Sequence, residues 1–520
     1  MKAINSESVL EVEVESGMRV MMRWVMVSLM IGMSSLGSTY LEQYNQLIEG
    51  LDLREAIADR SGETYPWSGV DHHNIELMDQ VTQEIERHRK GDFELTLIDS
   101  NGNAFEGSVE IEQVEHAFKF GANSWDFNQH PSAFSLSSES LQKLFNSANV
   151  CNYLNAWWRE LDEPYGNWSQ VRQELEWCGQ LGLDPRFHII QYVHMKKPGW
   201  WRELDSEEKL WDFYTKRVAD VADQFEGEFF EYDVMNEMIH WPYWFEKYDG
   251  AQYGMTNLFA FDWMRDPENG AKVVRQAREY LPDAKLVVLE TGIWNRHPEN
   301  TFAREIHAYF KRLIELDAPF DVIGYQGRYE PKGVGSVKTG KHSAGERMYF
   351  MESIDAGLEW FSELGKQMAI TEFSMPSRRL NEGAKPDDIG ADRNELALWV
   401  ANFHILAFSK PYINQVTWWN VFRREMGWID AGLINRDGSL TEVGQVMDEL
   451  INRRWHTQWK GQIKAGRQHF RGFYGDYLIR IEGHDPQTVR FLRGAVKQRI
   501  VLEQKRHKKE PILDGEFLLD

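Results

Sequence analysis

The chain has 520 residues and is longer than most single domains. Of these residues 42% are hydrophobic, which is enough to bury a large core. Its 81 acidic and 58 basic side chains give a formal net charge of −23. A surface of this sign repels nucleic acid and anionic membranes, so the composition argues against binding to either. The 21 Trp, 19 Tyr and 28 Phe residues supply flat rings that fill cores and can also stack on sugars.

The segment from Met18 to Ser38 has the order of a secretory signal peptide. Basic residues come first, the apolar run Trp24–Met33 follows, and small residues close the segment. The apolar run is shorter than a membrane-spanning helix usually requires. The alternative to a signal peptide is a membrane anchor or a helix of the fold. We therefore expect residues 1–38 to be a signal region and the protein to be secreted or periplasmic.

Residues 39–115 are expected to form a leader and a β-hairpin extension. Asp92–Val114 alternates between apolar and polar residues, with a turn at Asp99–Gly102. Farther along the chain, Cys151 and Cys178 lack the spacing of a thiolate metal site. We expect neither a metal nor a cofactor.

Residues 116–455 show eight short apolar runs that alternate with helical patterns. In two of the helical segments, 302–316 and 393–408, apolar residues recur at i, i+3, i+4 and i+7, as in helices that lie on a sheet. This alternation favours a closed (β/α)8 barrel; a doubly wound open sheet is the alternative, but no Gly-rich phosphate loop follows the first run. The eight runs are Ala117–Ala122, Ala148–Tyr153, Phe187–Tyr192, Phe230–Val234, Leu286–Leu289, Val322–Tyr325, Met368–Phe373 and Gln415–Trp419.

The alternation stops after the barrel, and residues 456–520 are expected to form a small β-rich appendage. Phe470–Ile481 and Thr488–Phe491 are its predicted strands.

Two glutamates stand where predicted barrel strands end. Glu237 lies three residues after the last residue of the fourth run, and Glu372 lies at the end of the seventh. Reactive residues of such barrels sit at the carboxyl ends of the strands. Two carboxyl groups facing one cavity suit glycoside cleavage, in which one donates a proton and the other attacks the anomeric carbon or activates water. For either glutamate alone, a structural ion pair is the alternative.

Four motifs add a family resemblance. They are HAFKFGAN at His116–Asn123, DVMNE at Asp233–Glu237, YQG at Tyr325–Gly327 and ITEF at Ile370–Phe373. In this order the motifs resemble glycoside hydrolase family 10, best known for β-1,4-xylanases. The resemblance covers residues 116–455 and implies a retaining mechanism on a (β/α)8 barrel.

The resemblance also implies roles for individual residues. Glu237 would be the general acid/base and Glu372 the nucleophile. Asn236 would donate a hydrogen bond to the 2-hydroxyl of the sugar in the −1 subsite. The remaining substrate contacts that it implies are Asn123, His194, Gln326, Trp419 and Trp428. Trp158 and Arg328, which stand where the chain departs from the family pattern, are expected to contact the substrate as well.

Three departures from the family pattern affect substrate recognition. Arg328 stands where the family usually has a histidine beside the nucleophile, and it would hold Glu372 ionised but make it a poorer nucleophile. Glu290–Thr291 replaces an Asn-Asp pair, and the loop Asn152–Pro164 is longer than usual.

The sequence therefore predicts a retaining endo-glycoside hydrolase for xylan or a xylan-like polysaccharide. One alternative is a glycan-binding protein on the same barrel that lost efficient catalysis, as the arginine beside the nucleophile would allow. The other is a retaining barrel glycosidase for another β-glycan. The expected partner is a polysaccharide or oligosaccharide, the expected oligomeric state is a monomer, and no contact with the membrane is expected after the signal is removed.

Overall fold

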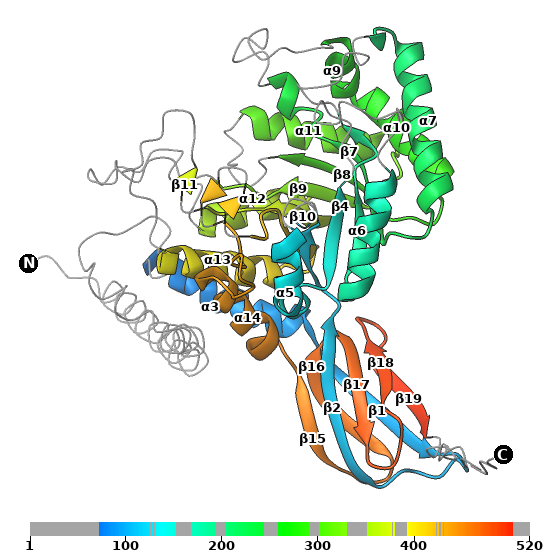
Figure 1. The fold of residues 1–520 in the computed structure, drawn as a ribbon, viewed down its shortest axis with the longest axis vertical. Coiled ribbons are helices and arrows are strands. Elements are labelled where there is room, and N and C mark those ends of the chain that lie inside the picture. Colours follow the sequence, from blue (N-terminus) through cyan, green and yellow to red (C-terminus); the bar gives the residue numbers. More distant parts are fainter. Residues whose placement is uncertain are drawn as a thin grey trace, which may run out of the picture.

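The computed structural model contains a barrel with a smaller β-module at one end (Figure 1). The structure describes residues 72–124, 127, 131–151, 168–192, 203–243, 258–291, 301–329, 351–376, 378–379, 393–422, 424–425, 428–429 and 431–502. The expected signal region and the loop Asn152–Pro164 lie outside the described residues.

Parallel strands close into the predicted (β/α)8 barrel. Neighbouring strands follow the order β5-β4-β3-β12-β10-β9-β8-β7-β6, and the pairing of β5 with β7 closes the ring. Because β5 and β6 are two pieces of the third strand, the ring has eight members, and each overlaps one of the predicted runs. The pieces are β3 (Lys119–Asn123), β4 (Ser147–Cys151), β5 (Asp184–His188), β6 (Gln191–Tyr192), β7 (Glu231–Asn236), β8 (Leu286–Thr291), β9 (Val322–Gln326), β10 (Gln367–Phe373) and β12 (Ile413–Trp418).

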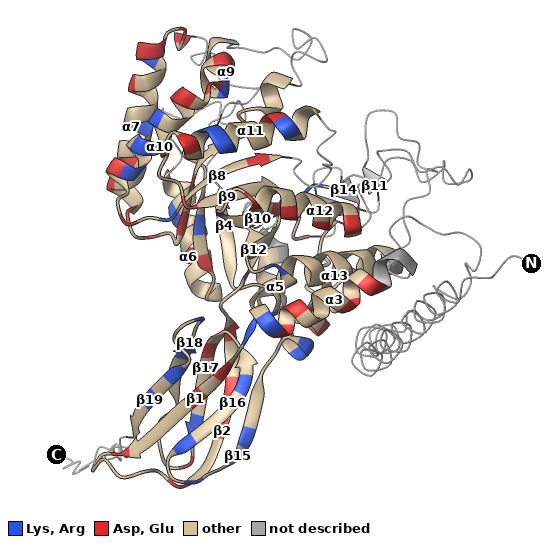
Figure 2. Ribbon diagram, turned by 180° about the vertical axis from the view of Figure 1, so that it is seen from behind, with Lys and Arg blue, Asp and Glu red and all other residues tan. Residues whose placement is uncertain are grey.

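Amphipathic helices surround the strands. The helix α11 (Thr301–Glu315) buries Phe302, Ile306 and Phe310, the stripe that its sequence predicts. Figure 2 shows acidic and basic residues interspersed along the helices α7, α10 and α11. The other helices are α5 (Pro131–Leu144), α6 (Trp168–Leu181), α7 (Glu207–Phe225), α9 (Leu258–Arg265), α10 (Pro267–Tyr280), α12 (Met351–Ser362), α13 (Arg393–Ser409) and α14 (Glu442–Glu449), followed by the π-helical turn Leu450–Arg454.

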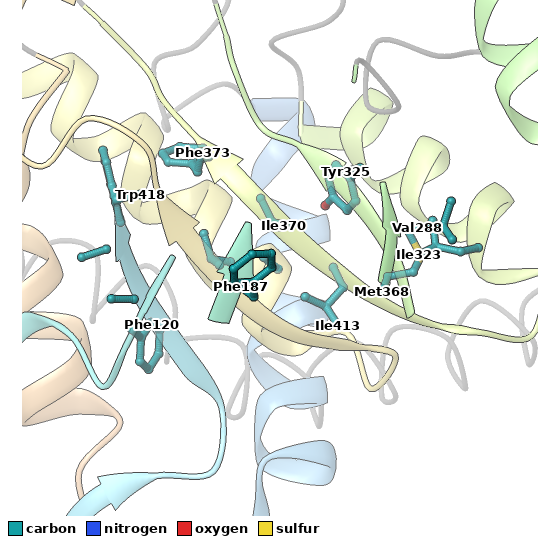
Figure 3. Close-up of a cluster of buried hydrophobic side chains, with 14 of the residues drawn as sticks. Phe120, Phe187, Val288, Ile323, Tyr325, Met368, Ile370, Phe373, Ile413 and Trp418 are labelled. Carbon is teal, nitrogen blue, oxygen red and sulfur yellow. The ribbon is translucent and has the colours of Figure 1, made fainter. Parts of the chain in front are cut away.

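The main hydrophobic core lies between the barrel strands and these helices. Its members include Phe187, Ile323, Ile370 and Phe373, which Figure 3 shows on several strands. A second, smaller cluster includes Val287 of β8, Val322 of β9 and Ala369 of β10, which are neighbouring strands, together with Trp419. Because successive residues of a strand point to opposite faces, one strand supplies both clusters. A small sheet of β11 (Arg378–Arg379), β14 (Trp428–Ile429) and β13 (Arg424–Glu425) is formed by segments that follow β10 and β12.

The strands β1 (Lys90–Asp99) and β2 (Gly107–His116) form where a hairpin was expected, but they do not pair with each other along their lengths. β1 pairs with β16 and β19, whereas β2 pairs with β15 and β17, which in turn pairs with β18. Only an isolated bridge between Ile98 and Ala104 links the segments near the turn. The expected single strand Phe470–Ile481 is likewise divided between the two sheets. The C-terminal strands are β15 (Gln458–Ile463), β16 (Arg467–Phe473), β17 (Gly475–Ile481), β18 (Gln487–Phe491) and β19 (Lys497–Leu502).

The physical reason is the burial of one apolar face on each strand. Phe93 and Leu95 of β1 pack in the same core as Ile111 of β2 and Tyr477 of β17. Two sheets that face each other bury both apolar faces, which a lone hairpin cannot do. Segments from both ends of the described chain therefore build one β-sandwich, where the sequence suggested separate flanks.

In the described part of the chain, one helix precedes the sandwich, and the sequence analysis did not predict it. This helix, α3 (His72–His88), packs against α13 of the barrel. Among the described residues, no helix is long and apolar enough to cross a membrane.

The centre of the sandwich provides a stability prediction. Phe93 is 1% exposed, and its ring stacks on Phe491 with the centroids 4.4 Å apart. Replacing Phe93 with Ala should lower the free energy of unfolding of the sandwich by about 3–5 kcal/mol through lost burial and a residual cavity. Hydrogen exchange of the amides of β1 and β17 measures this loss.

The control is Val501→Ala on β19, because that side chain is 52% exposed. It should change the free energy of unfolding by less than about 0.5 kcal/mol. A loss below about 1 kcal/mol for Phe93→Ala would contradict the sandwich core.

Candidate active site

The two predicted glutamates both lie at the carboxyl ends of barrel strands. Glu237 directly follows β7, and Glu372 is the penultimate residue of β10. Both are buried, with 6% and 1% of their surfaces exposed. Glu237 has a φ of +58°, a left-handed conformation that costs energy in a residue with a Cβ. The strand end therefore imposes a defined orientation on the Glu237 side chain.

Hydrogen-bond donors from two other strands hold the Glu237 carboxyl group. The hydroxyl of Tyr192 donates to Oε2 over 2.9 Å, and Nε2 of Gln326 donates to Oε1 over 2.6 Å. The same Gln326 nitrogen lies 3.2 Å from Oδ1 of Asn236. Burial, followed by the charge of Glu237, raises the pKa of Tyr192 well above its usual range, so its hydroxyl keeps its proton. The third, fourth and sixth barrel strands thus meet at one carboxyl group.

Two basic side chains contact the Glu372 carboxyl group. The guanidinium of Arg328 donates to Oε2, and Nε2 of His188 lies 3.5 Å from Oε1. Burial raises the pKa of Glu372, the positive charges of Arg328 and His188 oppose this rise, and the negative charge of Glu237 adds to it. The two carboxyl groups therefore interact electrostatically, as groups that share one site must.

Trp419 forms an aromatic wall beside these bases. The guanidinium carbon of Arg328 lies 4.3 Å from the centroid of its ring, and the ring of His188 lies 5.7 Å away. A cation over an indole face is favourable and restricts where the guanidinium can move. The backbone carbonyl of Trp419 accepts a hydrogen bond from Nδ2 of Asn123 over 3.2 Å. Asn123 thus supports the position of this wall.

A chain of buried charges lies beneath His188. Its Nδ1 is 2.6 Å from Oδ2 of Asp233, and Arg186 bonds to Asp233 and to Glu231. The carboxylate favours a proton on Nδ1 and so fixes which ring nitrogen faces Glu372. Every one of these side chains is almost fully buried, so each charge depends on its partners.

A third buried carboxyl group, that of Glu290, supports the turn that follows Glu237. Its Oε1 accepts a hydrogen bond from the backbone N–H of Ile239 over 2.5 Å, and its Oε2 accepts one from Thr291 over 3.1 Å. The N–H of Glu237 donates to the carbonyl of Leu289 over 3.2 Å. The end of β8 therefore holds the backbone of the acid-bearing turn at two points.

The sequence analysis identified some of these residues and missed others. The structure places Asn236, Gln326, Arg328 and Trp419 close to the two glutamates. His194 and Trp158 lie outside the described residues, and for Trp428 only the backbone strand β14 is described. The sequence analysis assigned no role to His188 or Tyr192, named Asp233 only as part of a motif, and named Glu290 only as a departure from the family pattern. Arg186 and His188 are two residues apart on one strand, so their side chains point to the same face of the sheet. This pattern was the signal in the sequence that could have identified His188 as a site residue.

Metal and disulfide chemistry find no support among the described residues. No group of three or more His, Cys, Asp or Glu residues in the described ranges could hold a metal ion. The two cysteines, Cys151 and Cys178, are both buried and are not joined in a disulfide.

A (β/α)8 barrel with two buried glutamates at the carboxyl ends of its strands is an architecture of glycoside hydrolases. The family model of glycosyl hydrolase family 10 matches residues 111–438. This match covers more than half of the chain, which therefore belongs to glycosyl hydrolase family 10.

Individual relatives are distant in sequence. Endo-1,4-beta-xylanase 2 of Arabidopsis thaliana is 25% identical over 334 residues, which are 63% of this chain and 26% of that protein. Anti-sigma-I factor RsgI6 of Acetivibrio thermocellus is 24% identical over 417 residues, which are 78% of this chain and 47% of that protein. The chain thus spans less than half the length of these curated relatives. The crystal structure of xylanase 10B from Thermotoga petrophila in complex with xylobiose is 19% identical, covers 65% of this chain and 94% of its own, and gives a TM-score of 0.47.

Glu290 yields a prediction for the pH dependence of stability. Burial raises its pKa from 4.5 to about 8, with the charge of Glu237 also contributing. At pH values between these two pKa values, Glu290 keeps its proton in the folded protein but releases it in the unfolded chain. Its titration therefore makes the free energy of unfolding fall as pH rises. Glu290→Gln removes the titration, and the free energy of unfolding between pH 5 and 8 should fall less steeply than in the wild type.

Urea denaturation at a series of pH values measures this slope. The matched control is Glu279→Gln, because Glu279 is exposed on α10. Identical slopes in the wild type and Glu290→Gln would show that the Glu290 carboxyl group does not titrate in this way.

Proposed function

We propose that the protein is a retaining endo-glycoside hydrolase that cleaves xylan or a xylan-like β-1,4-linked polysaccharide. The observation that carries this proposal is the position of two buried glutamates, Glu237 directly after β7 and Glu372 near the end of β10, at the carboxyl ends of strands of the same barrel. Membership of glycosyl hydrolase family 10 supports the chemistry, and relatives named as endo-1,4-beta-xylanases support the substrate class.

In the proposed first step, an oxygen of Glu372 attacks the anomeric carbon while Glu237 protonates the departing glycosidic oxygen. A covalent glycosyl ester forms and the leaving sugar departs. In the second step, Glu237 takes a proton from water, and that water displaces Glu372 with return of the original anomeric configuration. Gln326 and Tyr192 would keep the Glu237 carboxyl group in one orientation through both proton transfers.

Glu290 is proposed to act through Glu237 as a positioning residue. Its carboxyl group bonds to the amide of Ile239, two residues after Glu237, and so stabilises the turn that aims the acid. Asn236 and Trp419, which lie beside the two glutamates, are proposed to contact the sugar in the −1 subsite.

Arg328 supports a second candidate function, that of a glycan-binding protein with weak catalysis. The ion pair between Arg328 and Glu372 stabilises the carboxylate before attack. Glu372 loses its negative charge when it becomes an ester, so much of this stabilisation is lost on the way to the transition state. A slow first step is the expected consequence, and sugar binding without turnover would favour this candidate.

The expected location and oligomeric state are proposals of the same kind. The signal-like segment 18–38 supports a protein that is secreted or periplasmic. We propose that it acts as a monomer without membrane contact.

Substitution of each glutamate tests the assignment of roles. Glu237→Ala should slow hydrolysis of xylan by about 10²–10⁴-fold, because the leaving oxygen must then depart without a proton. With a dinitrophenyl xyloside, whose leaving group needs no protonation, Glu237→Ala should slow the glycosylation step much less. Glu372→Ala should abolish turnover of both substrates. Initial rates and the pre-steady-state burst measure these effects.

Glu279→Ala serves as the control, because it removes an exposed carboxyl group from α10. Unchanged rates in both active-site variants would refute the mechanism. Product analysis on xylan, β-glucan and other polysaccharides separates a xylanase from a glycosidase of another β-glycan, and the anomer released first tests retention.

The contact between Arg328 and Glu372 predicts a shift in the pH profile. In the wild type, the positive charge of Arg328 lowers the pKa of Glu372. Arg328→Gln removes this charge and should therefore raise the pKa of Glu372 further. The acidic limb of kcat/KM, which reports ionisation of the nucleophile, should then move up by about one pH unit or more.

Arg328→Lys is the matched control, since it retains the positive charge and loses only the planar fork. Its acidic limb should stay near that of the wild type. An equal shift in both variants would show that the fork geometry, rather than the charge, controls ionisation of Glu372.

A further inference from the structure

A cavity of about 360 Å³ lies where the barrel meets the β-sandwich. It is lined by Gln367 and Ile413, the first residues of β10 and β12, and by Tyr474 and Arg493 of the sandwich. Glu372 lies five positions after Gln367 on β10, a distance of about 16 Å along an extended strand. The cavity therefore lies at the end of the barrel opposite the candidate active site.

Arg89 lines this cavity, and two of the three nitrogens of its guanidinium group donate hydrogen bonds to backbone carbonyls. Its Nε donates to the carbonyl of Phe408 over 2.5 Å, and its Nη2 donates to those of Lys410 and Ile413 over 2.6 and 2.7 Å. These bonds satisfy carbonyls at and after the C-terminal end of α13. The guanidinium also lies 4.7 Å from the ring centroid of Phe118. Among the described residues, none accepts a hydrogen bond from Nη1.

A second guanidinium, that of Arg493, lines the same cavity. Arg493 is exposed, and its Nη2 lies 3.3 Å from both Nδ1 and the carbonyl oxygen of His88. The positive charge of Arg493 adds to the effect of burial, and together they lower the pKa of Arg89 to about 9. The two cations are therefore close enough to repel each other.

No carboxylate compensates this pair. The lining residues include no Asp or Glu, and neither arginine forms an ion pair with the part of the chain that the structure describes. The nearby Glu84 pairs with Arg87 and His88 instead. Buried charges in proteins are usually paired, but Arg89 faces the exposed guanidinium of Arg493 at this cavity instead of a carboxylate, in a chain with a net charge of −23. This arrangement requires an explanation.

We propose that the cavity binds an oxyanion group, such as carboxylate, sulfate or phosphate, between the guanidinium groups of Arg89 and Arg493. Guanidinium groups present planar N–H pairs that match the oxygens of such groups. Phe118 and Tyr474 give the cavity aromatic walls, against which the ring of an acidic sugar can pack. The ligand is therefore either a free oxyanion or an acidic sugar that carries the same group.

His116, which also lines the cavity, contributes no positive charge near neutral pH. Burial, as the largest cause, lowers its pKa to about 4. Its Nδ1 lies 3.2 Å from Nε2 of Gln113, within the sandwich. Binding of the oxyanion therefore depends on the two arginines.

The test is calorimetric titration of the full chain with sodium sulfate, sodium phosphate, glucuronate and glucose at constant ionic strength. The variant Arg493→Gln removes the exposed guanidinium, which makes no ion pair with the described residues. The variant Ala117→Asp places a carboxylate at an exposed position of the lining. The control Arg499→Gln makes the same charge change at an exposed position of β19 that does not line the cavity.

The wild type and Arg499→Gln should bind at least one of the three oxyanions saturably, and neither should bind glucose. Arg493→Gln should weaken this binding about tenfold or more, which is the loss expected for one charge-assisted hydrogen bond. Ala117→Asp should weaken it as well. Binding of glucuronate but not of the inorganic ions would identify an acidic sugar as the ligand, and the reverse would identify a free oxyanion.

The proposal is overturned if none of the oxyanions binds saturably, or if Arg493→Gln binds as tightly as the wild type. The outcome is independent of the proposed enzymatic activity. Glu372→Ala, which should lack turnover, should bind the oxyanion like the wild type.

Discussion

The burial of two carboxyl groups inside one closed barrel is the constraint on which the rest of the site depends. A carboxylate removed from water is costly unless donors or positive charges replace its hydration. Glu237 is satisfied by a phenol and an amide, whereas Glu372 contacts a guanidinium and an imidazole. This difference in partners gives the two chemically identical side chains different environments, which is what an acid and a nucleophile require.

The same constraint extends to the layer beneath the site. His188 faces Glu372 only because Asp233 bonds to its other ring nitrogen, and Asp233 is in turn held by Arg186. The position of Arg328 is likewise fixed on both sides, by the carboxylate and by the ring of Trp419. An arginine so constrained cannot move away easily when Glu372 becomes neutral. If the proposed reaction takes place, this arginine would therefore affect its rate more than the fold.

The two ends of the barrel differ in how they balance charge. At the carboxyl ends of the strands, Glu372 contacts two bases, whereas Glu237 accepts hydrogen bonds from neutral donors. At the amino ends of β10 and β12, Arg89 bonds to backbone carbonyls and faces another arginine across a cavity. The sandwich supplies that second arginine, so this cationic cavity exists only because both ends of the described chain fold against the base of the barrel.

The sequence by itself determined the eight strands and the place of the two glutamates. Short apolar runs separated by amphipathic helices admit few architectures, and a residue that follows such a run must lie at the barrel mouth. Tertiary structure alone decided which strands pair in the sandwich, because alternation shows that a strand has an apolar face but not what covers it. It also decided the roles of His188, Tyr192 and Glu290. Their function depends on atoms brought together from strands far apart in the sequence, and no local pattern records that contact.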